Sequence, residues 1–151
     1  MNYPNRRTLR YIVVGCIGAA ALAAGVALAH KKAHDAETLA AFQEVFMEQV
    51  KQGDLLFHGD PATQKSMGVN LSSTGMACAM CHPDGSDTHP YEFPKFQEQM
   101  NEFATLRDMI NWCIEKPNEG EKIDVNSDAM KALEAYIYYT NRNSPLSPGT
   151  H

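Results

Sequence analysis

The chain has 151 residues, of which 44% are hydrophobic and 21% charged, a composition typical of one globular domain with a short appendage. Residues 30–151 contain all 18 acidic side chains but only 10 of the 13 basic ones, so this part carries a formal charge of −8. Such an acidic balance excludes nucleic acid as an expected partner. It favours solubility, and it would also attract a protein with a basic docking face.

Residues 1–29 contain a signal for membrane insertion. Tyr11 to Ala29 is an uncharged run of 19 residues, which as a helix rising about 1.5 Å per residue nearly spans a bilayer core of about 30 Å. Three arginines before it favour the cytoplasmic side. Ala27-Leu28-Ala29 also supplies the small residues that signal peptidase reads, so an anchor and a cleaved signal segment both stay open. Either one places the rest of the chain on the periplasmic side of the inner membrane.

Residues 30–35 are predicted to be a polar linker, and residues 36–151 a single domain. The domain begins with apolar residues at spacings of three and four, namely Leu39, Phe42, Phe46 and Val50. This period predicts a helix with one apolar stripe that ends near Gly53. The stretch from His58 to Gly75 is rich in small and polar residues and has neither a helical nor a strand period, which predicts a loop.

The strongest chemical signal is Cys78-Ala79-Met80-Cys81-His82. Two thiols three positions apart can form thioethers to both vinyl groups of one porphyrin, and the histidine that follows can bind the iron as its proximal ligand. A zinc site would need a second pair of ligands, and a thioredoxin-like pair would need alternating strands and helices. An exported protein could also form a disulfide between Cys78 and Cys81, but the adjacent histidine favours haem. The single motif predicts one covalent haem c.

The remainder of the chain predicts a loop and two more helices. Prolines within residues 83–94 exclude a continuous helix there. An apolar face predicts a helix over Thr105–Glu115, where Thr105 and Asp108 have the spacing of a capping box. Ser127 is predicted to cap a last helix, whose apolar face consists of Met130, Leu133, Tyr136, Ile137 and Thr140. No strand is predicted, so the fold class is all-α.

The order of parts resembles a class I cytochrome c fold, in which the first and last helices cross beside the haem. A longer set of segments resembles one haem domain of the thiosulfate dehydrogenase family and of the A subunit of the Sox thiosulfate-oxidising complex. The resemblance covers about residues 50–142. Its segments are Gly53–Phe57, Asp60-Pro61, Gly75, Cys78–His82, His89-Pro90, Phe93-Pro94, Leu106, Ile110-Asn111, Cys113-Ile114 and Ala132–Ile137.

The resemblance implies that Cys113 is the distal ligand of the iron. Its position is also physically reasonable, because Cys113 lies on the apolar face of a helix between the haem motif and the last helix. A thiolate ligand would stabilise ferric iron and lower the reduction potential. The alternatives are that Cys113 is a small buried hydrophobic residue and that another group takes the position. These other candidates are Met100, Met109, Met130, His58, His89 and an open site.

Three functions are compatible with this pattern. Two of them are single-electron transfer between redox partner proteins, which is the expected function. The chain would act either as a free-standing carrier or as a relay subunit of a larger membrane complex. The alternative is a haem subunit of a thiosulfate-oxidising enzyme. Thiosulfate dehydrogenases have two haem domains, so a second haem would come from another chain, and catalysis by this chain alone is not expected. Arg107 and Lys95, the nearest candidates for binding an anion, are expected on solvated faces.

Overall fold

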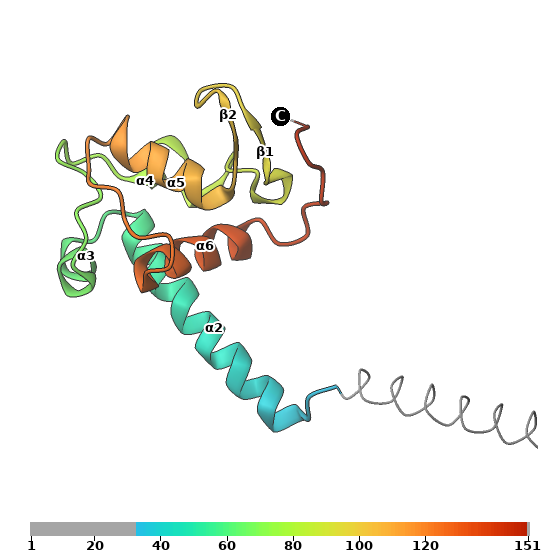
Figure 1. Ribbon diagram of the computed structural model, residues 1–151. Coiled ribbons are helices and arrows are strands. Elements are labelled where there is room, and N and C mark those ends of the chain that lie inside the picture. Colours follow the sequence, from blue (N-terminus) through green and yellow to red (C-terminus); the bar gives the residue numbers. More distant parts are fainter. Residues whose placement is uncertain (1–32, 151) are drawn as a thin grey trace, which may run out of the picture. The chain divides into compact units, whose positions relative to one another are not determined.

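The computed structural model describes residues 33–150 (Figure 1), so the predicted anchor or signal segment, residues 1–29, lies outside the described residues. The chain divides into two units between Ala40 and Ala41, and the packing discussed below lies within residues 41–150. Within the described range, no helix combines the length and the apolar character that a membrane crossing requires.

The described residues are mainly helical. The α-helices are α2 (Ala36–Phe57), α3 (Pro61–Met67), α4 (Cys78–Cys81), α5 (Leu106–Glu115) and α6 (Asp128–Thr140). Two short 3₁₀ helices, η1 (Pro83–Gly85) and η2 (Pro90–Glu92), follow the haem motif. Two strands, β1 (Lys95–Gln97) and β2 (Glu102–Ala104), form an antiparallel hairpin in which Phe96 pairs with Phe103. The helical prediction is confirmed, whereas the expectation of no strand is wrong.

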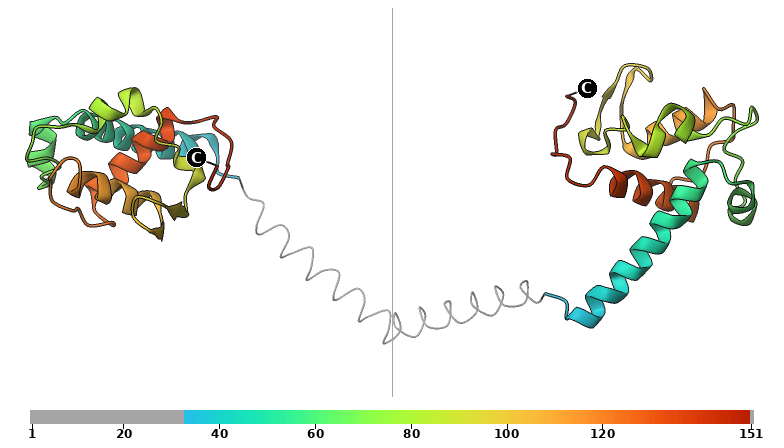
Figure 2. Two further views of the ribbon diagram at one scale, coloured as in Figure 1. Left: turned by 90° about the horizontal axis from the view of Figure 1, so that it is seen from above. Right: turned by 180° about the vertical axis from the view of Figure 1, so that it is seen from behind.

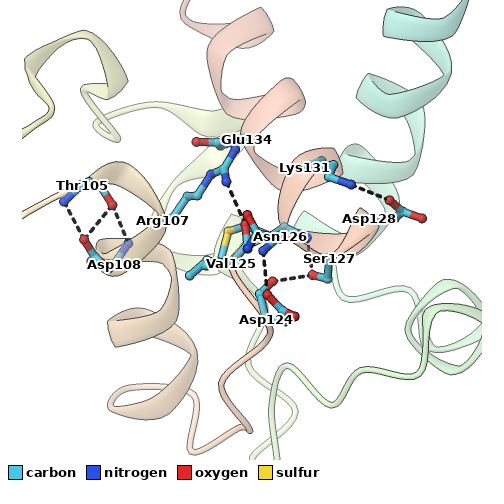
Figure 3. A network of polar contacts seen from close by, with 11 residues as sticks. Thr105, Arg107, Asp108, Asp124, Val125, Asn126, Ser127, Asp128, Lys131 and Glu134 are labelled. Atoms are coloured by element: carbon cyan, nitrogen blue, oxygen red, sulfur yellow. Dashed lines mark hydrogen bonds and ion pairs between the residues drawn. The ribbon is translucent and has the colours of Figure 1, made fainter.

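Helices α5 and α6 begin where the capping signals predict. The Thr105 hydroxyl accepts a hydrogen bond from the Asp108 backbone N–H at 3.3 Å, and the Asp108 carboxylate accepts one from the Thr105 backbone N–H at 2.8 Å. Ser127 Oγ accepts from the Met130 backbone N–H at 3.1 Å. Figure 3 shows these caps around the segment that joins the two helices. Each cap satisfies backbone donors that would otherwise lack a partner in the first turn.

Helix α2 continues four residues beyond its predicted end at Gly53, as far as Phe57. Glycine weakens a helix, but here it is needed for close packing, because a Cβ at position 53 would collide with the carbonyl oxygen of Ala132 and lie 2.7 Å from the Tyr136 Cβ. The α2–α6 crossing places Phe57 against Tyr136, with ring centroids 5.0 Å apart. The buried part of α2 is therefore its C-terminal end, while Phe46 remains 43% exposed.

The predicted loop from His58 to Gly75 contains helix α3, so that prediction is wrong for residues 61–67. Asp60 caps this helix through its side chain, which accepts from the Thr63 backbone N–H at 2.7 Å. Pro61 occupies the first helical turn, and Gly68 ends the helix in the left-handed conformation with φ of 66°. These residues are the usual start and stop signals of a helix. Residues 61–67 show no apolar helical period, which is why a loop was predicted there.

One apolar core joins the helices of the domain. Its members are buried side chains from α2, α5, α6 and the loops between them, and they include Val50, Leu56, Phe57, Leu71, Leu106, Ile110, Ile114, Ile123, Met130, Leu133, Tyr136 and Ile137. Asn111 is buried beside them, and its amide exchanges two hydrogen bonds of 2.9 Å with the backbone N–H and C=O of Ile123. This pair of bonds attaches the α5–α6 connection to α5.

Candidate haem site

A cavity of about 690 Å³ lies between α4, α5, α6 and β1, with Phe57 at the end of α2 also on its wall. Its size falls in the range of about 300–1,000 Å³ that is usual for small-molecule and cofactor sites. Much of its wall is apolar, with side chains from three helices, namely Phe57, Leu106, Ile110, Leu133 and Ile137. The same cavity is lined by Cys78, Cys81, His82 and Cys113. All three cysteines among residues 33–150 therefore meet at one site.

The haem motif forms the single turn α4 and its C-cap. The His82 backbone N–H donates to the Cys78 carbonyl at 2.9 Å, which closes the turn and brings the histidine to the end of the cysteine pair. The Nδ1 atom of His82 lies 3.0 Å from the Ser86 carbonyl oxygen. A carbonyl can only accept, so Nδ1 donates in this contact, and in the neutral imidazole it is then Nε2 that has the lone pair. This is the arrangement expected of a histidine that binds metal through Nε2.

Cys113 projects from α5 into the same cavity. Burial, with a smaller contribution from the neighbouring Cys81, raises the pKa of the Cys113 thiol to about 11. Burial, with a contribution from Cys113, likewise raises the pKa of the Cys78 thiol to about 11. Cys113 on α5 thus lies on the wall of the same cavity as Cys78 and Cys81. The form of cysteine that binds a metal is the thiolate, so this thiol would lose its proton only when it binds the iron.

The other predicted ligands separate into two groups. Met109 and His89 line the cavity, and the Met109 sulfur accepts a hydrogen bond from Gln97 Nε2 at 3.3 Å. Met130 is completely buried in the apolar core, and neither it nor Met100 is among the lining residues. His58 is also absent from the lining and contacts Asp54, with Nδ1 2.9 Å from a carboxylate oxygen.

Arg107 and Lys95, which were both expected on solvated faces, differ in their exposure and in whether they line the cavity. Arg107 is partly exposed and donates to Glu134 at 2.8 Å and to the Val125 carbonyl at 2.9 Å (Figure 3). It does not line the cavity. Lys95 is only 9% exposed and lines the cavity, so the expectation for Lys95 is wrong. Sequence reasoning missed this buried charge. The available signal was Glu92, three residues earlier, which pairs with it.

The fold and the site define a c-type cytochrome domain, because a helical Cys-x-x-Cys-His turn opens into an apolar cavity with a further thiol on its wall. Comparison with known proteins gives the family. The family described as "SoxA/TsdA, cytochrome c domain" matches residues 68–146, which is more than half of the chain. The chain therefore belongs to this family, and the predicted resemblance is confirmed.

A thiosulfate dehydrogenase of Psychrobacter arcticus is similar to this chain, with 26% identity over 92 residues. The match covers 56% of this chain and 28% of that relative, so the chain spans less than a third of the curated relative that it matches. Family membership implies covalently bound haem c and electron transfer through it. Cytochromes of this kind are typically periplasmic.

Proposed function

We propose that this protein is a membrane-associated periplasmic cytochrome that transfers single electrons through one covalent haem. Cys78 and Cys81 would form the thioethers, His82 would be the proximal ligand and Cys113 the distal ligand. The observation that carries the proposal is that these four side chains, from α4, its C-cap and α5, line one cavity. Bound haem would supply a metal centre that accepts and releases one electron without bond chemistry on a substrate.

The protein residues have four tasks at this site. The α4 turn fixes the spacing of both thiols, and the Ser86 carbonyl orients the His82 ring through its Nδ1–H. The apolar side chains of α5 and α6 exclude water, which makes charge changes inside the cavity costly. A thiolate from Cys113 would add negative charge next to the iron and so favour the ferric state. The proposed carrier therefore has a low potential.

The distal ligand is tested by Cys113→Ala in the haem-bearing protein. We expect loss of the low-spin thiolate spectrum of the ferric form and a higher midpoint potential, because one negative charge beside the iron disappears. The matched control is Met109→Leu, which alters the other described sulfur-containing side chain on the wall outside the haem motif. The control should keep the parent spectrum. An unchanged ferric spectrum in Cys113→Ala would eliminate this cysteine as ligand.

The membrane association rests on the uncharged run Tyr11 to Ala29 and the arginines before it. Expression of the full chain with a haem-attaching maturation system, followed by membrane fractionation and mass measurement, tests it. An anchor predicts intact protein in the membrane fraction that detergent, but not salt, releases. A soluble periplasmic product that begins after Ala29 would show cleavage instead.

A second candidate function is a haem subunit of a thiosulfate-oxidising enzyme. The similarity to a thiosulfate dehydrogenase favours it, although the match covers only 28% of that relative. In that case Cys113 would also take part in sulfur chemistry. The two functions separate in one assay with thiosulfate and an artificial electron acceptor. Formation of tetrathionate by the purified protein refutes the simple carrier, whereas no turnover together with rapid reduction by a partner supports it.

A further inference from the structure

A buried ion pair lies on the wall of the proposed haem cavity. The Lys95 ammonium donates to the Glu92 carboxylate at 2.7 Å, and the two side chains are only 9% and 5% exposed. The ammonium also lies 5.2 Å from the centre of the Phe93 ring. The other oxygen of Glu92 is 3.7 Å from His89 Nδ1. Glu92 of η2 thus lies close both to His89, which directly precedes η2, and to Lys95, the first residue of β1.

Stability alone does not explain this pair. Removing an ammonium and a carboxylate from water costs several kcal/mol for each ion, and their mutual attraction offsets this only in part. Well-packed apolar residues in such places are often equally stable. The exposed pair of the same spacing, Lys131 with Asp128 at 3.0 Å, carries no comparable desolvation cost. A buried charge beside a cofactor cavity therefore indicates a binding role.

The direction in which the pair faces indicates what it binds. Lys95 lines the cavity and Glu92 does not, so the cavity meets the cationic member of the pair. The lining also contains the carboxylates Asp87 and Glu98, but both of these residues are exposed, so Lys95 is the buried charge among the lining residues. An ammonium in a low-dielectric wall is a strong partner for a carboxylate. The expected ligand group is therefore an anion.

Haem carries its own pair of carboxylates. Its two propionates lie on the edge of the porphyrin opposite the two vinyl groups, and the vinyl edge is the one that Cys78 and Cys81 would hold at α4. The propionate edge must then point to a part of the wall away from α4. Both α4 and β1 contribute to the lining, and Figures 1 and 2 show them as separate segments around α5 and α6.

We propose that the Lys95 ammonium binds a haem propionate and that Glu92 is a positioning residue, which holds the ammonium at the cavity wall. The inference rests on the proposed attachment of haem at the Cys78–His82 motif. Lys95 then has two functions. It neutralises a propionate that would otherwise be buried without a partner, and its positive charge raises the reduction potential against the effect of a thiolate ligand.

The test uses the haem-bearing full chain and two readouts, the propionate bending band in the resonance Raman spectrum and the midpoint potential. In Lys95→Met we expect a shifted propionate band and a lower potential, because a positive charge near the iron is lost. This variant removes the ammonium that pairs with the buried Glu92 carboxylate, which lowers the stability of the fold. Lys95→Met/Glu92→Gln removes both charges. We expect it to fold, to show the shifted band, and to lower the potential less.

The matched control is Lys131→Met, which breaks an exposed pair of the same spacing and should leave both readouts unchanged. The inference is overturned if the double variant keeps its haem and shows the parent propionate band. A failure of the proposed function is distinguishable, because absence of covalent haem leaves every variant and the parent without the cytochrome absorption spectrum. A parent protein with haem and unaffected variants refutes only the role of Lys95.

Discussion

Replacing Gly53 by alanine tests whether the α2–α6 crossing determines the stability of the domain. Two effects act in opposite directions. Helix propensity alone would stabilise the protein by about 1 kcal/mol, because glycine is the poorer helix former. The added Cβ, however, would collide with the Ala132 carbonyl oxygen and lie 2.6 Å from its carbonyl carbon. Neither atom can rotate away, so the helices must separate.

The cost of such overpacking is typically about 1–3 kcal/mol, and a backbone obstacle places it at the upper end. After subtraction of the propensity gain, we expect a net loss of about 2 kcal/mol in the free energy of unfolding. Urea unfolding of the haem-bearing protein, followed by far-UV circular dichroism, measures it. Lys51→Ala, on an exposed position of the same helix, is the control and should change stability by less than about 0.5 kcal/mol. Stabilisation of Gly53→Ala by about 1 kcal/mol would refute the close crossing.

Three further variants probe the surroundings of the site. Asn111→Ala leaves the buried N–H and C=O of Ile123 without partners and should lower the free energy of unfolding by about 2 kcal/mol in urea titrations. Thr105→Ala removes a helix cap and should cost about 1 kcal/mol. Hydrogen bonds from Thr105 lower the pKa of Asp108 below its ordinary value of 3.8. Their contribution is therefore present above that pH and disappears as the pH falls through the lower folded pKa, so Thr105→Ala should lose less stability on acidification than the parent. Arg107→Met should cost less than about 1 kcal/mol and leave the visible spectrum unchanged, because this side chain does not line the cavity.

Features that depend on neighbouring residues could be predicted well. The caps at Thr105 and Ser127 were found correctly because a cap needs only a side chain and a backbone group three residues later. The haem motif is local for the same reason, since its chemistry depends on five consecutive residues. Helix α3 had equally local signals in Asp60, Pro61 and Gly68, but it was missed because an amphipathic period was required as well.

Features that depend on distant segments could not be predicted in the same way. Gly53 weakens a helix by its propensity. Only the close approach of α6, about eighty residues later, shows why this position inside α2 needs a glycine. The burial of Lys95 is similar, since Glu92 three residues earlier predicts an ion pair but does not show whether that pair is exposed or lies at a cavity wall. Long-range packing decided both cases.

The amino-acid sequence by itself determined the chemistry of this protein, namely the paired thiols and the histidine of the haem motif, because covalent attachment requires only their spacing along the chain. The tertiary structure decided which other groups share the cavity with them. Cys113 and Lys95 come from α5 and β1 and reach that wall only after the helices have packed. The physical reason is that ligand sets and buried charges depend on distances in space, which the order of residues leaves open until the core has formed.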